Sequence, residues 1–154
     1  MTARDPALPT TLLIDRDGDR DGAVARVTIN RPAVLNAMSS QTLDELENTL
    51  TALGRDESVR VVVITGAGEK AFVAGADIAE MNDLSPVQAR DFSRFGQKLM
   101  VRIEQLGKPV IAMINGFALG GGLEVALSCD IRYVAEDARL GLPEIKLGII
   151  PGSG

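Results

Sequence analysis

A glycine-rich segment between an apolar run and a helical pattern constrains the fold of this chain more than any other feature. The glycines lie within residues 115–122, after the apolar run Val110–Ile114 and before a helix predicted over Leu123–Ser128. A strand, a tight turn and a helix in direct succession are typical of α/β proteins. The N–H groups that open such a helix have no partner within it and carry positive potential. The turn alone therefore allows two interpretations, close packing of the helix on the strand or binding of an anionic oxygen.

Strands and helices alternate along the chain, which predicts one α/β domain over residues 11–154 after a flexible N-terminus over residues 1–10. The further predicted elements are a hairpin of strands over 11–14 and 23–29, a helix over 41–53 that starts after Ser39 or Ser40 and ends at Gly54, a strand over 59–65, a small-residue loop over 66–75, a helix over 86–106 and a strand over 131–134.

Composition excludes several classes of function. The chain has 16 basic and 21 acidic residues, a net charge of −5, which argues against a nucleic-acid surface or a polybasic membrane contact. It has no histidine, so Ser-His-Asp and Cys-His catalysis are excluded. The single cysteine, Cys129, has apolar neighbours, which predicts a buried structural thiol in a reducing compartment. With no apolar run of about 18 residues and no secretory signal, the sequence predicts a cytoplasmic protein.

Two short motifs partly match a calcium-binding loop and a dinucleotide-binding loop, but each lacks a residue that the full motif needs. Asp17–Gly22 matches the first half of a calcium-binding EF-hand loop, but Thr28 stands where the loop needs a glutamate and the flanks are β-like. Gly66-Ala-Gly68 follows a predicted strand, as a dinucleotide motif does, but the third glycine is missing. We therefore expect a solvated acidic turn and a simple loop, with no metal and no nucleotide cofactor.

Two carboxylates favour the anion-binding interpretation of the glycine-rich turn. Glu124 is predicted in the first turn of the helix that follows the glycines, and Glu144 follows Pro143 in a similarly apolar segment. A second small-residue loop, Phe72–Asp77, offers another N–H group at Ala76. Two N–H donors from separate loops can stabilise an oxyanion, and adjacent carboxylates can move protons next to a carbonyl group.

These segments together resemble the enoyl-CoA hydratase/isomerase (crotonase) family. The matching motifs are Asn30-Arg-Pro-Ala-Val-Leu-Asn-Ala37, Ala71-Phe-Val-Ala-Gly-Ala-Asp-Ile78, Ile114-Asn-Gly-Phe-Ala-Leu-Gly-Gly-Gly-Leu-Glu124 and Leu142-Pro-Glu-Ile-Lys-Leu-Gly-Ile-Ile-Pro-Gly152. The resemblance implies a spiral of ββα units that binds an acyl-CoA thioester and needs no cofactor besides the CoA of its substrate. It implies an oxyanion hole made by the N–H groups of Ala76 and Gly121. The implied CoA-binding residues are Ala33, Val34, Leu35, Ala74, Ala76, Asp77, Ile78, Ala79 and Gly121.

Both family glutamates are present, so the resemblance implies a hydratase that adds water to trans-2-enoyl-CoA. In that role Glu144 exchanges a proton with the α-carbon, and Glu124 activates the water that adds at the β-carbon. An isomerase, another acyl-CoA lyase or an acyl-CoA-binding fragment without turnover are the alternatives. In relatives a C-terminal helical region follows the last motif and builds trimers or hexamers. Since the sequence ends at Gly154, we expect an incomplete core with exposed apolar surface.

Overall fold

The computed structural model describes residues 9–16 and 23–153 and has the predicted α/β fold. The strands are β1 (Leu12–Arg16), β2 (Val24–Ile29), β3 (Val61–Gly66), β4 (Ala71–Val73), β5 (Val110–Ile114), β6 (Phe117–Leu119), β7 (Ile131–Val134) and β8 (Leu140–Gly141). The α-helices are α1 (Ser40–Arg55), α2 (Ile78–Asn82), α3 (Pro86–Glu104) and α4 (Gly121–Ser128), and short 3₁₀ helices are η2 (Pro32–Val34) and η3 (Pro143–Leu147). Residues 1–8 and the acidic turn 17–22 lie outside the described residues, but strands β1 and β2 flank that turn.

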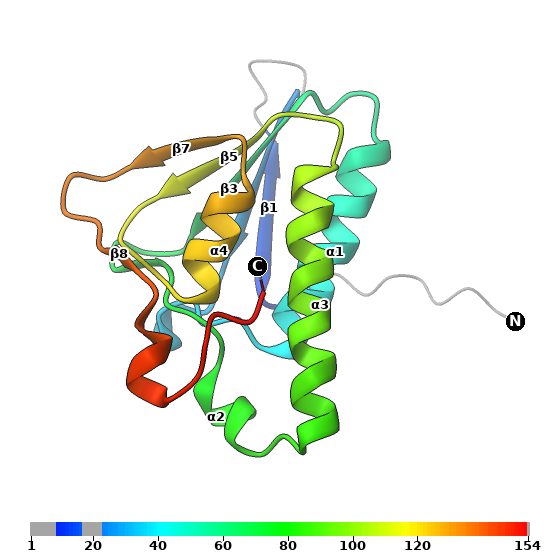
Figure 1. Cartoon of the computed structure of the whole chain (residues 1–154). Coiled ribbons are helices and arrows are strands. Elements are labelled where there is room, and N and C mark those ends of the chain that lie inside the picture. The colour runs from blue at the N-terminus through cyan, green and yellow to red at the C-terminus, as the bar shows by residue number, and fades with distance from the viewer. Residues whose placement is uncertain (1–8, 17–22, 154) are drawn as a thin grey trace, which may run out of the picture.

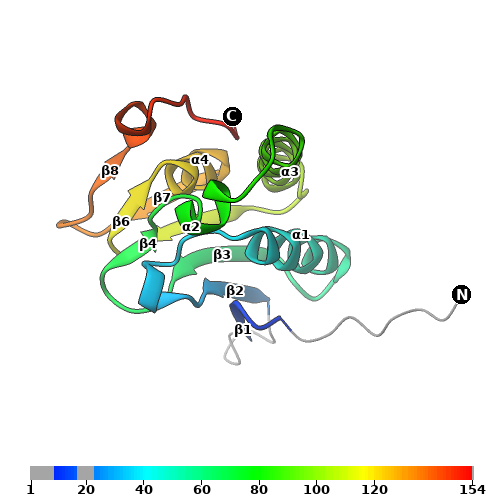
Figure 2. The ribbon, with the colours of Figure 1, turned by 90° about the horizontal axis from the view of Figure 1, so that it is seen from below.

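The strands form two sheets. The larger has the order β1-β2-β3-β5-β7, with β1 antiparallel to β2 and every other pair parallel. The smaller has the order β4-β6-β8 and is parallel throughout. Figure 1 shows α1 and α3 side by side next to the larger sheet. Figure 2 shows the strands β4, β6 and β8 of the smaller sheet to one side of α1 and α3.

After the first hairpin the chain repeats one pattern of two strands and a helix. Each pair β3/β4, β5/β6 and β7/β8 gives its first strand to the larger sheet and its second to the smaller sheet. A helical segment follows each pair: α2 with α3, then α4, then η3. This repetition is the predicted spiral of ββα units, and it brings the turns that follow β4, β6 and β8 to one end of the molecule.

Serine side chains cap the N-termini of the two long helices, at Ser39 as the sequence predicted and at Ser85. The side chain of Ser39 accepts a hydrogen bond from the Thr42 N–H (3.2 Å) at the start of α1. Ser85 and Gln88 form a capping box at the start of α3. The apolar faces of these helices meet the sheet in one core, in which α1 contributes Leu43, Leu46, Leu50 and Leu53, and α3 contributes Leu99, Met100 and Ile103.

The prediction that Gly54 ends the first helix is wrong. Helix α1 continues to Arg55, and Gly54 lies inside it against Leu106, whose Cδ1 would be 3.2 Å from an added Cβ. The glycine therefore serves the packing of α1 on the end of α3. The ammonium group of Lys108 then binds the carbonyl oxygens of Leu53 (2.7 Å) and Asp56 (2.5 Å), which satisfies acceptors at the helix end.

The predicted loop over 66–75 and the glycine-rich turn each contain a strand of the smaller sheet. Strands β4 and β6 have three residues each, too few for a periodic pattern. Two asparagines hold the backbone that leads into β4. The buried Asn36 donates to the carbonyl oxygens of Ala67 (3.0 Å) and Ala71 (2.8 Å), and Asn115 donates to that of Gly66 (2.9 Å).

Cys129 is buried, as predicted, with 4% of its surface exposed. Burial raises the pKa of its thiol to about 12, so the thiol stays protonated at neutral pH.

Within residues 9–16 and 23–153, no helix combines the length and the apolar character needed to cross a membrane.

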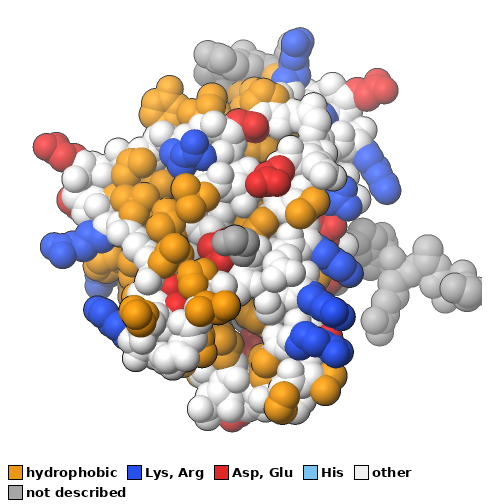
Figure 3. All heavy atoms as spheres, viewed as in Figure 1, with side chains coloured by type: hydrophobic (Ala, Val, Ile, Leu, Met, Phe, Trp, Pro, Cys, Tyr) orange, Lys and Arg blue, Asp and Glu red, His pale blue; other side chains and the backbone are white. Residues whose placement is uncertain are grey.

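Apolar side chains are exposed in the later part of the chain, as the sequence led us to expect. Ile145 (83%), Ile150 (82%) and Tyr133 (67%) are among the most exposed of them. The space-filling view shows hydrophobic side chains gathered on the side of the molecule where β7 and β8 lie (Figure 3). An apolar surface of this kind marks a place where other protein can pack.

The carboxylate of Glu45 joins the start of β1 to α1, and it makes the stability of the fold depend on pH. It accepts hydrogen bonds from the N–H (2.8 Å) and hydroxyl (2.7 Å) of Thr11 and from the N–H of Thr10 (3.1 Å). Burial raises the pKa of Glu45, but these bonds outweigh that effect and lower it from 4.5 to about 2. The stabilisation is therefore complete above pH 4.5 and is lost as the pH falls towards 2.

We predict that Glu45→Gln lowers the free energy of unfolding at pH 7 by about 1 kcal/mol, because a neutral amide accepts these bonds more weakly. The loss of stability of the native sequence between about pH 4.5 and pH 2.5 should be smaller in this variant. Urea unfolding followed by circular dichroism at both pH values measures it. Glu104→Gln, on the exposed face of α3, is the matched control and should keep the native pH dependence. An unchanged pH dependence in Glu45→Gln would contradict the assignment.

Candidate active site

A cavity of about 670 Å³ collects the sequence-predicted carboxylates and N–H donors in one place. Ala76, Gly121, Glu124 and Glu144 all line it, although they come from three separate segments of the sequence. The rest of its wall is mainly apolar and includes Met38, Leu43, Ile78, Met81, Phe92, Leu119, Leu147 and Ile150. The site thus combines an apolar space with a few polar groups, as small-molecule sites usually do.

The start of α4 is pressed against strand β4 by its glycines. Gly120 has φ 53° and ψ −128°, a conformation that favours glycine, and it directs the chain into the helix. A Cβ added at Gly122 would lie 2.1 Å from the carbonyl oxygen of Val73 in β4. Only glycine allows this approach. It places the N–H of Gly121, the first residue of α4, at the cavity wall with no partner inside the helix.

Ala76 lies in the turn between β4 and α2, and the backbone on both sides of it is fixed. Gly75, with φ 97°, accepts a hydrogen bond from the N–H of Met38 (2.9 Å), and the N–H of Asp77 donates to the carbonyl of Met38 (2.9 Å). The N–H groups of Ala76 and Gly121 themselves donate to no other backbone carbonyl among the described residues. Two held donors beside one cavity are suited to binding a carbonyl oxygen or an oxyanion.

Glu124 is buried in the first turn of α4, with 5% of its surface exposed. Its Oε1 accepts a hydrogen bond from the backbone N–H of Ser153 (2.8 Å). Its Oε2 lies near the helix start, 3.6 Å from the position of a Cβ on Gly121. A carboxylate is costly to bury unless it is hydrogen-bonded. The bond from Ser153 both compensates part of this cost and fixes the carboxylate at the cavity.

Glu144 reaches the same place from η3. Its Oε1 lies against Gly120, where a Cβ would be only 2.6 Å away, so that glycine makes room for the carboxylate. Its buried Oε2 has no hydrogen-bond partner among the described residues. Unsatisfied buried oxygens are rare in folded proteins and are often found at functional sites. Glu124 and Glu144 therefore flank the start of α4 from two elements.

Only some of the residues that the resemblance implies in CoA binding line the cavity. Ala74 and Ile78 line the cavity together with Ala76 and Gly121. The others do not line it: Ala33, Val34, Leu35, Asp77 and Ala79. Ala33, Val34 and Leu35 form an exposed turn that is tied to the site by the bond from the Ala74 N–H to the Leu35 carbonyl (3.1 Å).

Asp77 is occupied by a neighbouring cation. Its carboxylate accepts a hydrogen bond from Arg31 (2.8 Å), and this bond keeps the pKa of Asp77 below its usual value. The pair joins the turn before α1 to the turn before α2, so it stabilises the backbone around Ala76.

The sequence did not point to two parts of the site. Met38, Leu43 and Phe92 form part of the apolar wall, and the sequence signal for Leu43 and Phe92 was only that of a core-facing helix. Ser153 contacts Glu124 across 29 positions of the sequence. No local pattern reveals such contacts, because they depend on how distant elements pack.

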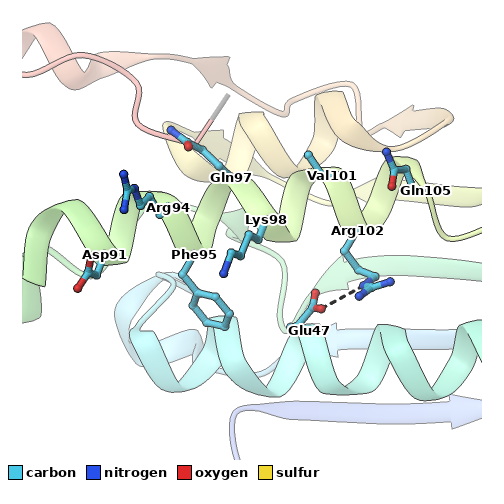
Figure 4. A pocket seen from close by; sticks show the side chains of 9 residues that line it. All are labelled: Glu47, Asp91, Arg94, Phe95, Gln97, Lys98, Val101, Arg102 and Gln105. Carbon is cyan, nitrogen blue, oxygen red and sulfur yellow. Dashed lines mark hydrogen bonds and ion pairs between the residues drawn. The ribbon is translucent and has the colours of Figure 1, made fainter.

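A second, more open cleft of about 820 Å³ lies along α1 and α3 (Figure 4) and contains none of the predicted site residues. Glu47 of α1 and Arg102 of α3 form an ion pair across it, with 3.0 Å between Oε1 and Nε. The side chain of Arg102 is 43% exposed and that of Glu47 is 23% exposed, and pairs at the surface contribute little to stability. In the described part of the chain, no three His, Cys, Asp or Glu side chains gather closely enough to hold a metal ion.

Comparison with known proteins shows which sequences and folds this chain is similar to. A family model described as enoyl-CoA hydratase/isomerase matches residues 19–154. A short-chain-enoyl-CoA hydratase of Clostridium acetobutylicum is 53% identical over 136 residues, which are 88% of this chain and 52% of that protein. A crotonyl-CoA hydratase of Syntrophomonas wolfei is 49% identical over the same shares of the two chains. The crystal structure of an enoyl-CoA hydratase from Bacillus anthracis has a TM-score of 0.88 and 44% identity, covering 94% of this chain and 55% of that one.

The fold and the site define a protein of ββα units in which backbone donors and two glutamates share one cavity. Taken with the comparisons, this places the chain in the enoyl-CoA hydratase/isomerase family. The chain spans about half the length of the curated relatives it matches.

The contact between Gly122 and Val73 gives a direct test of how the site is held. We predict that Gly122→Ala lowers the free energy of unfolding by about 1–3 kcal/mol. The reason is that the added Cβ meets backbone and a branched Cβ (2.7 Å) that move only with β4. Thermal or urea unfolding measures this. Gly141→Ala in β8 is the control, since its Cβ would be 3.9 Å from the nearest side chain. Equal stability of the two variants would show that β4 accommodates the methyl group.

Proposed function

We propose that this chain carries the catalytic core of an enoyl-CoA hydratase, which adds water across the double bond of a trans-2-enoyl-CoA to give a 3-hydroxyacyl-CoA. The observation that carries the proposal is that one cavity is lined by Glu124 and Glu144 together with two N–H donors, Gly121 at the start of α4 and Ala76 in the turn after β4. The names of the relatives support a substrate with a short acyl chain.

The thioester carbonyl oxygen accepts hydrogen bonds from the N–H groups of Ala76 and Gly121. Addition of water at the β-carbon moves negative charge onto this oxygen as an enolate forms. The positive potential at the start of α4 stabilises that charge. Donors that are already in place need no reorganisation during the reaction, and each is worth about 10²–10³ in rate at comparable sites.

Each of the two glutamates carries out one proton transfer of the reaction. Glu124 removes a proton from the water as its oxygen forms a bond with the β-carbon. Glu144, in its protonated form, delivers a proton to the α-carbon as the enolate returns to the thioester. The product gains one water in total, and a proton passes back from Glu124 to Glu144 before the next turnover. The unpartnered Oε2 of Glu144 is consistent with a proton-transfer role.

The remaining substrate contacts follow the shape of the cavity. The acyl chain lies along the apolar wall formed by Met38, Phe92 and their neighbours. The CoA part leaves past Ala74 and Ile78 towards the turn Ala33–Leu35 and the segment Asp77–Ala79. Ala79 offers this CoA no charged contact. The reaction needs no metal or separate cofactor, and we place it in the cytoplasm. Assembly into trimers or hexamers belongs to the same proposal.

The test is hydration of crotonyl-CoA, followed as loss of its absorbance. We predict that Glu124→Gln and Glu144→Gln each lower kcat by roughly 10²–10⁴, with KM little changed, because the proton transfers are lost while binding is kept. Glu136→Gln is the matched control, since Glu136 is exposed between β7 and β8. An active preparation in which neither site variant lowers the rate would overturn the roles of the two glutamates.

Two other outcomes would replace the proposal. Conversion of a 3-enoyl-CoA to a 2-enoyl-CoA, without hydration of crotonyl-CoA, would identify an isomerase. Binding of acyl-CoA in calorimetry without turnover of either substrate would identify a binding protein.

A further inference from the structure

The segment that follows η3 joins helix α3 to the buried glutamate of α4. The Oγ of Ser93 and the Nε2 of Gln97 both donate to the carbonyl oxygen of Gly152, at 2.6 and 3.1 Å. The next residue, Ser153, donates its N–H to Oε1 of Glu124 (2.8 Å). Figure 2 shows this C-terminal segment passing beside α4 towards α3. A chain of hydrogen bonds therefore runs from α3 through two backbone positions to a carboxylate of the cavity.

Gly96 completes the contact between α3 and this segment. It is buried in the interior of α3, where glycine weakens a helix relative to alanine. A Cβ added there would lie 2.5 Å from the Oγ and 3.1 Å from the Cβ of Ser153. Glycine at this position is thus explained by the close approach of Ser153 rather than by the helix itself.

We propose that Ser93, Gly96 and Gln97 form a seat on α3 that positions Glu124 through the backbone of Gly152 and Ser153. The inference rests on the proposed function and adds positioning residues to it. A glutamate has several rotatable bonds, and activation of water requires its carboxylate in one orientation. The N–H of Ser153 supplies a charge-assisted hydrogen bond to Oε1, and Oε2 lies 3.6 Å from the position of a Cβ on Gly121. The seat keeps that N–H in place.

Gly96→Ala separates this role from a structural one. An alanine favours the helix, so we expect the midpoint of thermal unfolding to stay equal or rise. Because the methyl group displaces Ser153, we expect kcat for crotonyl-CoA hydration to fall at least tenfold with KM within twofold. Hydrogen exchange of the Ser153 amide, measured by NMR without substrate, should become at least tenfold faster. Gly54→Ala in α1 is the matched control, because its methyl group meets first the flexible end of the Leu106 side chain; its kcat should not change.

A compensating substitution tests the contact itself. Ser153→Gly removes the Oγ and Cβ that the new methyl group of Gly96→Ala would meet, and it leaves the Cα at an ordinary 3.9 Å. Gly96→Ala combined with Ser153→Gly should therefore recover kcat to within threefold of the native sequence and restore slow exchange at position 153. Native kcat and exchange in Gly96→Ala alone, or no recovery in the double variant, would overturn the seat.

Double variants test whether the hydrogen bonds of the seat act through Glu124 or through Glu144. Gln97→Glu replaces a donor to the Gly152 carbonyl with an acceptor, and we expect kcat to fall about fivefold. That loss should vanish in a Glu124→Gln background and persist in a Glu144→Gln background, because the seat acts through Glu124. Gln105→Glu makes the same change at the exposed end of α3 and should leave kcat unchanged. An equal loss in both backgrounds would contradict the inference.

The two proposals fail in different ways. If the native chain does not hydrate crotonyl-CoA, the proposed function is wrong, and amide exchange of Ser153 in Gly96→Ala and Glu124→Gln still decides whether the seat holds Glu124. If the chain is active and the exchange of Ser153 is the same in all variants, the seat is wrong and the proposed function stands.

Discussion

The close approach of α4 to β4 at Gly122 and Val73 is the constraint on which the rest of the structure depends. Two other glycines act in the same way, since a Cβ on Gly116 would be 2.3 Å from the carbonyl oxygen of Lys70, and one on Gly66 would be 2.2 Å from that of Ala71. The small second sheet forms where these glycines let backbone meet backbone. Its position determines where the turns carrying the two N–H donors lie, so the chemistry of the site begins with packing.

The same packing explains how two carboxylates come to share a partly buried cavity. Glu124 is carried by α4, whose first turn offers positive potential, and a backbone N–H binds it from a later segment. Glu144 arrives on η3 after β8 has paired with β6, and Gly120 leaves space for its carboxylate. Each glutamate thus depends on a backbone arrangement built elsewhere. Their different surroundings are consistent with the separate roles of water activation and proton delivery that we propose.

Local patterns in the sequence predicted the large elements and missed the small ones. Strand β5 and helices α1 and α3 have enough residues to show an apolar pattern, and the cap of α1 lies at Ser39, one of the two serines that the sequence offered. Strands β4, β6 and β8 have three residues or fewer, which is too short to show the alternation of apolar and polar residues that is typical of a strand. At the site, the motifs predicted the residues with chemical groups, and Ala76, Gly121, Glu124 and Glu144 do line one cavity. The apolar wall and the contact of Ser153 with Glu124 arise from the packing of α1, α3 and the last segment, which no spacing in the sequence reveals.

The groups that we propose hold the carbonyl oxygen belong to the backbone, whereas those that we propose move protons belong to side chains. A point mutation can delete a glutamate, but it cannot delete an N–H group except by introducing proline. The carbonyl-binding half of such a site is therefore inherited with the fold, and the proton-transfer half can be exchanged one residue at a time. A scaffold divided in this way can change the reaction it catalyses over evolution while it continues to hold the same kind of thioester.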